Sequence, residues 1–229
     1  MATPLDLQEQ EQLDALKAFW KQYGNLITWL LIAALAAYAA LNGWRWYQRD
    51  QAAKAGAMFE QLEVAALAGD AQRAGQIFAD LKERYARTTF AGQGALLAAH
   101  AQFDKGQVDA ATASLGWAAD NAREDAYQTV ARLRLAGLLM QAKQFDAALS
   151  ELDKAKSPDF VALVADRRGD VLVAQGKADA AREAYQTAWK AMDPRLEYRQ
   201  LIDAKLTALG SPPDTAAAPV VAGAADSPK

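Results

Sequence analysis

The stretch GDVLVAQGKADAAREAYQTAWKAMDP, residues 169–194, decides how most of this chain is expected to fold. Alanine and other good helix formers fill it, while Gly176 interrupts it and a proline ends it, so it predicts two helices joined by a short turn. Small residues let the helices of such a hairpin approach closely, and the larger Tyr185 fills the space against a neighbour. One hairpin of this kind cannot bury its apolar face alone, so further copies are expected.

Three earlier segments repeat the same pattern. One alanine per copy aligns at spacings of 37, 37 and 33 residues, at Ala74, Ala111, Ala148 and Ala181. Four residues after each alanine comes a large residue, namely Phe78, Leu115, Leu152 or Tyr185. These positions are expected on the second helix of each hairpin. The spacing is close to the period of about 34 residues of tetratricopeptide repeats. We therefore predict an all-α chain with a tetratricopeptide-like α-solenoid of about four stacked hairpins.

The turn of each hairpin is predicted five residues before the aligned alanine. Three copies have glycine there, at Gly69, Gly106 and Gly176, and Lys143 in the third copy departs from the pattern. Three copies also have an aspartate two residues before the alanine, at Asp109, Asp146 and Asp179. A short side chain that can accept backbone hydrogen bonds suits the start of a helix, so the aspartates are expected to begin the second helices.

One more helix is predicted after the last repeat. Asp193 and Pro194 would open it as its N-cap and first residue, and Gly210 would end it. Its apolar side comprises Tyr198, Leu201, Ile202, Leu206 and Leu209. This helix is expected to cap the repeat domain, residues 48–210. Residues 211–229 are rich in Pro and Ala, nearly uncharged and without an apolar stripe, which predicts a disordered tail.

A different kind of sequence precedes the repeats. Residues 22–44 contain no charged side chain, and LITWLLIAALAAYAAL at 26–41 is their most apolar part. As a helix, this segment of 23 residues would extend roughly 34 Å, against a bilayer core of roughly 30 Å. We therefore predict a single transmembrane helix over residues 22–47. Aromatic residues suited to the two membrane interfaces flank it: Trp20, Tyr23, Trp44, Trp46 and Tyr47.

Two other interpretations of the apolar stretch stay open. A buried core helix would need surroundings that are apolar on every side, which a soluble domain rarely supplies. A cleaved signal peptide could use Ala37-Tyr38-Ala39, but a basic opening segment is missing and the apolar run is long. Residues 1–21 predict a short amphipathic lead-in with a helix stop at Gly24. Because no turn residue follows Trp46, the anchor helix is expected to run on into the repeat domain.

Composition narrows the chemistry. A net charge of −3 argues against nucleic acid as a partner. The chain has no cysteine and a single histidine, His100, which excludes Cys-His pairs and sites with several histidine ligands. No Gly-rich phosphate loop follows a strand, and the carboxylates are mixed with Lys and Arg as on exposed helices. We expect no catalytic residues, no metal site and no cofactor.

A repeat array offers a concave surface lined by the first helix of each hairpin. The positions expected there lie fifteen and eight residues before the aligned alanines: Phe59, Leu96, Leu133 and Asp166, then Ala66, Phe103, Met140 and Val173. Most are apolar, and together with His100 they predict a groove for an unfolded or helical apolar segment. The positions hold no Lys or Arg, so a basic clamp for a C-terminal carboxylate is not expected. The capping helix or neighbouring repeats could instead cover these residues.

The whole arrangement resembles a known family. The segments YGNLITWLLIAALAAYAALNGWRWYQ at 23–48 and FDKGQVDAATASLGWA at 103–118 are similar to the ancillary SecYEG translocon subunits, the YfgM-like proteins of Gram-negative inner membranes. The resemblance covers roughly residues 5–209. It implies an inner-membrane protein with a periplasmic repeat domain. It also implies association with the SecYEG translocon, the membrane-anchored chaperone PpiD and emerging unfolded polypeptides.

The charges near the anchor point the other way. Lys17 and Lys21 precede it and Arg45, Arg49 and Lys54 follow it, so the positive-inside rule slightly favours a cytoplasmic repeat domain. The resemblance implies a cytoplasmic N-terminus and periplasmic repeats, and we adopt that orientation. The expected function is that of a non-enzymatic, membrane-anchored protein that binds a periplasmic chaperone and assists newly exported proteins. The alternative is a regulatory adaptor that sequesters a signalling protein at the membrane.

Overall fold

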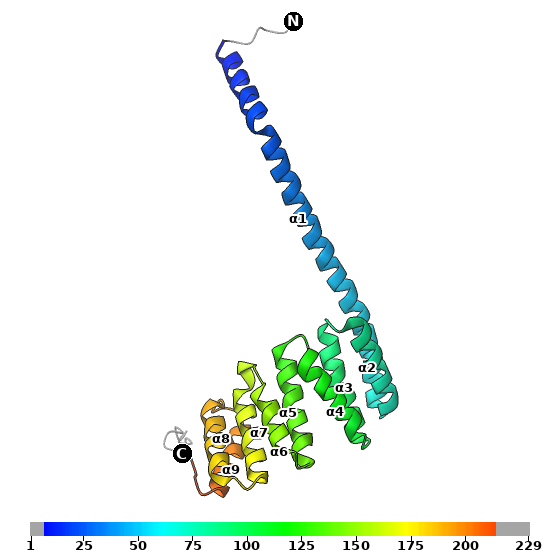
Figure 1. Cartoon of the computed structure of the whole chain (residues 1–229), viewed down its shortest axis with the longest axis vertical. Helices are drawn as coiled ribbons and strands as arrows, with labels where there is room; N and C mark the ends of the chain where they lie inside the picture. Colours follow the sequence, from blue (N-terminus) through cyan, green and yellow to red (C-terminus); the bar gives the residue numbers. More distant parts are fainter. Residues whose placement is uncertain (1–6, 214–229) are drawn as a thin grey trace, which may run out of the picture. The chain divides into compact units, whose positions relative to one another are not determined.

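The computed structural model describes residues 7–213, and the side chains from residue 11 onward. Within this part every regular element is helical, in the order α1 to α9, with one short 3₁₀ helix between α6 and α7 (Figure 1). The prediction of an all-α fold is confirmed for these residues. Residues 1–6 of the predicted lead-in and residues 214–229 of the predicted disordered tail lie outside the described part. The chain divides into two compact units, Met1–Ala53 and Lys54–Lys229.

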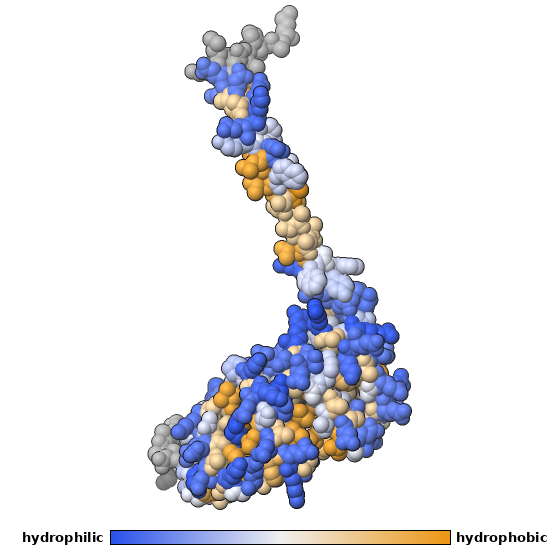
Figure 2. Space-filling model, viewed as in Figure 1, coloured by the Kyte–Doolittle hydropathy of each residue, from blue (hydrophilic) through white to orange (hydrophobic). Residues whose placement is uncertain are grey.

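Helix α1 (Leu7–Leu67) contains the predicted anchor. It is the one helix among residues 7–213 that is long and apolar enough to cross a membrane. Its large apolar side chains, such as Leu30, Leu35 and Leu41, are exposed, and Figure 2 shows this apolar surface around the middle of the helix. Each such side chain gains about 1.5–3 kcal/mol when it leaves water. These features fit a single-pass membrane protein.

The predicted helix stop at Gly24 is wrong, because α1 continues through this residue. Gly24 is buried under Trp20, whose indole ring would lie 3.2 Å from a Cβ atom at this position. The glycine therefore makes room for the indole and does not end the helix. The prediction that the anchor helix continues into the repeat domain is confirmed, since residues 54–67 of α1 belong to the second compact unit.

Four helical hairpins follow one another in the second unit, and a single helix completes them. Their helices are the end of α1 with α2 (Ala71–Tyr85), α3 (Thr89–Asp104) with α4 (Val108–Asn121), α5 (Asp125–Gln141) with α6 (Phe145–Asp153), and α7 (Val161–Ala174) with α8 (Ala178–Ala191). The 3₁₀ helix η1 (Pro158–Phe160) precedes α7, and α9 (Tyr198–Ala208) packs on α8. The predicted array of four hairpins with a capping helix is therefore confirmed.

The aligned alanines lie on the second helices, as predicted. Each is 0% exposed: Ala74, Ala111, Ala148 and Ala181. The large residues four positions later are at most 3% exposed: Phe78, Leu115, Leu152 and Tyr185. A methyl group at the first position lets two backbones approach, and the larger side chain fills the space beside it. Successive hairpins share one core, since the rings of Phe78 in α2 and Trp117 in α4 lie edge to face at 5.4 Å between centroids.

The four turns adopt one conformation although one of them lacks glycine. Gly69, Gly106 and Gly176 have φ angles of 68°, 72° and 76°, and Lys143 has a φ of 59°. The four turns also form the same pair of backbone hydrogen bonds. Around Lys143, its own N–H donates to the carbonyl oxygen of Met140 at 3.0 Å and the next N–H donates to Leu139 at 2.8 Å. Lysine departs from the pattern in residue type only, at a conformational cost of roughly 1–2 kcal/mol relative to glycine.

The aspartates predicted at the helix starts lie two residues after the N-cap positions. Asp109, Asp146 and Asp179 are the second residues of α4, α6 and α8, and no side chain caps these three helices. Their carboxylates stand in the first turn, where they interact favourably with the positive end of the helix dipole. In the first copy a true cap is present, because Asp70 accepts a hydrogen bond from the backbone N–H of Arg73 at 3.0 Å.

The capping helix begins later than the sequence predicts. Asp193 and Pro194 do not open it, since α9 starts only at Tyr198. Asp193 instead closes a turn by accepting a hydrogen bond from the backbone N–H of Arg195 at 2.9 Å. The helix ends at Gly210 as predicted, with a positive φ of 72°.

The apolar side of α9 packs against α8 through only part of the predicted stripe. Ile202 and Leu206 are 0% and 1% exposed and belong to a core that also contains Ala188 and Met192. Leu201 is 47% exposed and faces solvent. The stripe is therefore narrower than predicted, but it covers the open end of the last hairpin.

Charged residues fasten α9 to α7. The ammonium group of Lys205 lies 2.8 Å from both carboxylate oxygens of Asp166 and 2.8 Å from Asp170, and the hydroxyl of Tyr198 donates to Asp166 at 2.8 Å. Burial, the hydrogen bond to Asp166 and the nearby negative charges raise the pKa of Tyr198 to about 12. Asp166 is only 2% exposed, so its charge depends on these partners.

The two helices of the last hairpin cross at Gly169. A Cβ atom at this position would lie 2.3 Å from the ring of Tyr185, which is buried and whose hydroxyl donates to Asp170 at 2.9 Å. Neither the ring nor the opposite backbone can move away without breaking this packing. The glycine therefore sets how close α7 and α8 lie.

Replacing Gly169 with alanine tests this close approach. Overpacking costs about 1–3 kcal/mol, and alanine regains about 1 kcal/mol of helix propensity, so we expect Gly169→Ala to lower the free energy of unfolding by about 1 kcal/mol. The matched control is Gly116→Ala in α4, where a Cβ atom meets nothing within 4 Å. For this variant we expect the free energy of unfolding to rise. Denaturant unfolding followed by far-UV circular dichroism measures both. Equal shifts in the two variants would contradict the packing role.

Replacing Lys205 with methionine tests the fastening of α9. Asp166 would remain buried without a cation, so we expect the variant to lose about 3 kcal/mol or more of unfolding free energy. The double variant Asp166→Asn with Lys205→Met removes the unpaired charge and should recover part of the loss, while the exposed Lys190→Met in α8 should unfold like the native chain. If Lys205→Met also unfolded like the native chain, the ion pair would not hold α9 in place.

Candidate functional site

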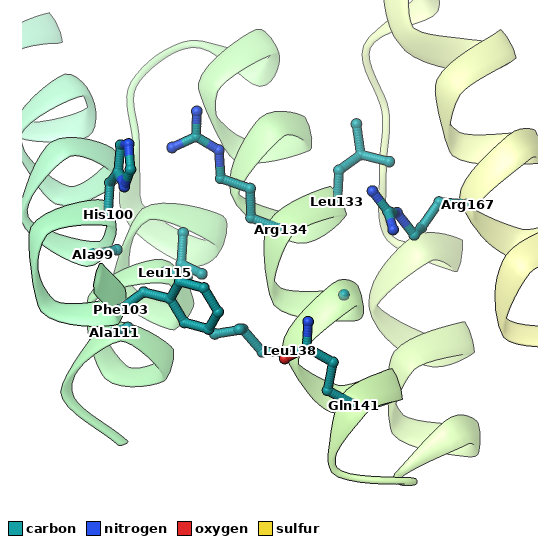
Figure 3. A pocket seen from close by; sticks show the side chains of 11 residues that line it. Ala99, His100, Phe103, Ala111, Leu115, Leu133, Arg134, Leu138, Gln141 and Arg167 are labelled. Atoms are coloured by element: carbon teal, nitrogen blue, oxygen red, sulfur yellow. The ribbon is translucent and has the colours of Figure 1, made fainter. Parts of the chain in front are cut away.

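The repeat unit contains a hollow between α3, α4, α5 and α7, which we call the central hollow. Its volume is about 380 Å³. Its apolar lining includes Phe103, Leu115, Leu133 and Leu138, and its polar lining includes His100, Arg134, Gln141 and Arg167. Figure 3 shows the two arginines and Leu133 on one side of this hollow and Phe103 and Leu138 on the other. The hollow can thus contact apolar and charged parts of one ligand at the same time.

The residues predicted for a groove divide into two groups. His100, Phe103 and Leu133 line the central hollow. Phe103 is 40% exposed, which is unusual for a phenylalanine inside a folded domain. The ring of His100 lies beside the carboxylate of Asp104, with 3.1 Å between Nδ1 and Oδ2, and both side chains are exposed. The structure therefore brings together three of the predicted side chains on α3 and α5.

The remaining predicted residues lie elsewhere. Leu96 is 8% exposed and belongs to the core between the first hairpins. Met140 is half-buried against the core around Leu152, and Phe59 stacks on Phe90 at 5.7 Å between ring centroids. Asp166 is buried against α9, and Val173 is 44% exposed outside the hollow. The capping helix thus covers one predicted position, which is the alternative that the sequence left open.

A second hollow lies beside the first, between the end of α1 and α3, and we call it the acidic hollow. Its volume is about 370 Å³, and His100 lines both hollows. Ala66, Leu67 and Leu97 are among its apolar lining residues, and its carboxylates are Glu63 and Asp104. The surface of the first helices therefore changes from negative charge near α1 to positive charge near α5 and α7.

The two arginines of the central hollow were not identified from the sequence. Arg134 and Arg167 each follow a predicted groove position by one residue, at Leu133 and Asp166. Neighbouring residues on a helix differ in direction by about 100°, and a concave surface is wide enough to include both. The two aligned positions on each first helix therefore cover only part of the concave surface. Extending the alignment by one residue would have shown arginine in two successive repeats.

Neither arginine is strongly neutralised. Arg134 is exposed, and its Nη1 donates to the carbonyl oxygen of Leu96 at 3.3 Å. Among the described residues no carboxylate lies within ion-pair distance of Arg134. Arg167 is 3.7 Å from Asp170, whose carboxylate also accepts from Lys205 at 2.8 Å. This side of the hollow therefore carries an excess of positive charge.

The predicted interface aromatics of the anchor lie on exposed faces of α1. They range from 42% to 70% exposed: Trp20, Tyr23, Trp44, Trp46 and Tyr47. Trp20 and Trp44 are 24 positions apart, which corresponds to roughly 36 Å along a helix at about 1.5 Å per residue. This separation is suited to the two interfaces of a bilayer whose core is roughly 30 Å thick. Within residues 7–213 no three His, Cys, Asp or Glu side chains are grouped so that they could hold a metal ion.

Known proteins are similar to this chain over most of its length. A family model described as a tetratricopeptide repeat-like domain matches residues 17–211. The chain is 34% identical over 212 residues to the ancillary SecYEG translocon subunit of Neisseria gonorrhoeae, which covers 89% of this chain and 98% of that protein. The protein of the same name from Escherichia coli is 30% identical over 187 residues, or 80% of this chain and 87% of that protein.

A further relative agrees with these two. The ancillary SecYEG translocon subunit of Haemophilus influenzae is 28% identical over 185 residues, which cover 80% of this chain and 89% of that protein. The family model spans residues 17–211, which include the apolar helix and the four hairpins. These matches confirm the resemblance seen in the sequence, and they show that the chain belongs to the family of ancillary SecYEG translocon subunits with a tetratricopeptide repeat-like domain.

Proposed function

We propose that this chain is a non-enzymatic subunit associated with the SecYEG translocon. The observation that carries the proposal is the similarity to a relative whose name states that association. The two chains are 34% identical over 98% of the relative's length. The fold supports it, because tetratricopeptide-like arrays present surfaces for other proteins. The exposed apolar helix α1 supports a location in the membrane where the translocon lies.

The site and the resemblance together support a finer proposal. The repeat domain binds the membrane-anchored chaperone PpiD and contacts newly exported polypeptides as they emerge. The central hollow, with the exposed Phe103 and volume of about 380 Å³, is the surface best suited to hold part of a polypeptide. The chain therefore keeps a chaperone close to the place where unfolded proteins enter the periplasm.

The same proposal includes an orientation. The chain crosses the bacterial inner membrane once, with its N-terminus in the cytoplasm and its repeat domain in the periplasm. The count of Lys and Arg near the anchor slightly favours the reverse, so the orientation rests on the resemblance. It is also the orientation that lets the repeats meet exported chains.

Co-purification tests the proposed association. The full chain, tagged and extracted from bacterial membranes in a mild detergent, is expected to retain SecYEG subunits and PpiD. An unrelated single-pass protein with the same tag serves as the control. Recovery of a soluble regulatory protein without translocon subunits would contradict the proposal and favour a regulatory adaptor.

Reporter fusions test the orientation. Alkaline phosphatase folds to an active enzyme only in the periplasm, so fusion after Gly210 should give an active reporter. β-Galactosidase fused at the same residue is the complementary control and should be inactive. An inactive phosphatase together with an active β-galactosidase would place the repeats in the cytoplasm and overturn this part of the proposal.

A further inference from the structure

We propose that the central hollow binds a polypeptide segment in which acidic side chains adjoin apolar ones. The apolar side chains enter the hollow, and the carboxylate side chains pair with Arg134 and Arg167. This inference rests on the proposed function and names the kind of segment that the repeat domain accepts. It also differs from the purely apolar groove that the sequence predicts.

The apolar part of the segment has a defined place. Phe103, Leu115 and Leu138 line the hollow, and Phe103 keeps 40% of its surface exposed. A cavity of about 380 Å³ falls within the range of about 300–1,000 Å³ typical of ligand sites. A few apolar side chains of a partner would therefore fill it and remove the exposed phenylalanine from water.

The acidic part of the segment follows from the charges on one side of the hollow. Arg134 and Arg167 come from two successive hairpins, and both line the same space. Among residues 7–213 the partner of Arg134 is a backbone carbonyl oxygen, and Asp170 near Arg167 is shared with Lys205. Carboxylates match the planar donor groups of arginine, and such charge-assisted hydrogen bonds are strong beside apolar surface.

A purely apolar segment would bury the guanidinium group of Arg134 without an anion and leave Arg167 with only the shared Asp170, which is unfavourable. An extended polyanion such as nucleic acid would meet the net charge of −3 of the chain and the carboxylates of the acidic hollow. A peptide with a few carboxylates at one end avoids both penalties. Glu63 and Asp104 repel those carboxylates from the α1 side. The acidic end of the segment therefore lies over α5 and α7.

Peptide binding to the full chain in lipid nanodiscs tests the inference, with empty nanodiscs as the blank. The probe is a fluorescent peptide with a short leucine and phenylalanine core followed by two aspartates and an amidated end. Its matched partner has asparagines in place of the aspartates. A third peptide has the same apolar core but neither aspartates nor asparagines, and its C-terminal carboxylate is free. Because hydrogen bonds between a carboxylate and arginine are stronger than those of a neutral amide, the aspartate peptide should bind at least about tenfold more tightly than the asparagine peptide.

Variants assign this preference to the hollow. In the double variant Arg134→Gln with Arg167→Gln, the two peptides should bind equally. Arg123→Gln, an exposed arginine outside the hollow, should keep the full preference. Phe103→Gln should weaken both peptides alike. If circular dichroism shows that the double variant is not folded, the exposed Arg134→Gln alone should still lower the preference several-fold.

Other results would overturn the inference. Equal binding of the aspartate and asparagine peptides to the native chain, or no binding of either, would do so. A preference that survives the double arginine substitution would place the binding site elsewhere. Tighter binding of the third peptide would identify a chain-end carboxylate in place of acidic side chains. Co-purification with the translocon is scored separately, so a failure here with that association intact refutes the peptide specificity and leaves the proposed function standing.

Discussion

The structure depends on one constraint, which is that no hairpin in this chain can bury its own apolar face. The fully buried alanines of α2, α4, α6 and α8 mark where each hairpin closes, and the large side chains four residues later reach the shared core. Each hairpin is therefore stabilised mainly by packing against the adjacent hairpins. The two ends of the array are the places where a neighbour is missing. At one end residues 54–67 of α1 supply the first helix, and at the other α9 covers the last hairpin.

The central hollow is a product of the same stacking. Its lining comes from α3, α4, α5 and α7, which belong to three successive hairpins. Arg134 and Arg167 are 33 residues apart in the sequence and meet at one cavity only because α5 and α7 are neighbours in the array. A site built across repeats needs no special loop. It requires that the chosen residues occupy equivalent positions on first helices, and that the array fixes their spacing.

The sequence predicts the repeat register well, because a buried alanine and a large residue four positions later are selected by packing that every copy shares. The sequence predicts helix boundaries less well where a single local interaction determines them. Gly24 reads as a helix stop but accommodates Trp20, and Asp193 reads as an N-cap but closes a turn before α9. Lys143 lacks the expected residue type yet adopts the expected φ. The burial of Asp166 depends on Lys205, 39 residues later, and no local pattern indicates such a contact.

That long-range pair also determines how stable a chain would be if it ended before α9. Asp166 lies at the fourth aligned first-helix position, but its partner is made only when α9 has been synthesised. A polypeptide that stops before Lys205 keeps a carboxylate in a place meant for an ion pair, and the apolar end of the last hairpin stays uncovered. The energetic penalty falls on the final repeat and leaves the earlier ones intact. In a chain truncated before α9, the last repeat is therefore expected to unfold more readily than the others.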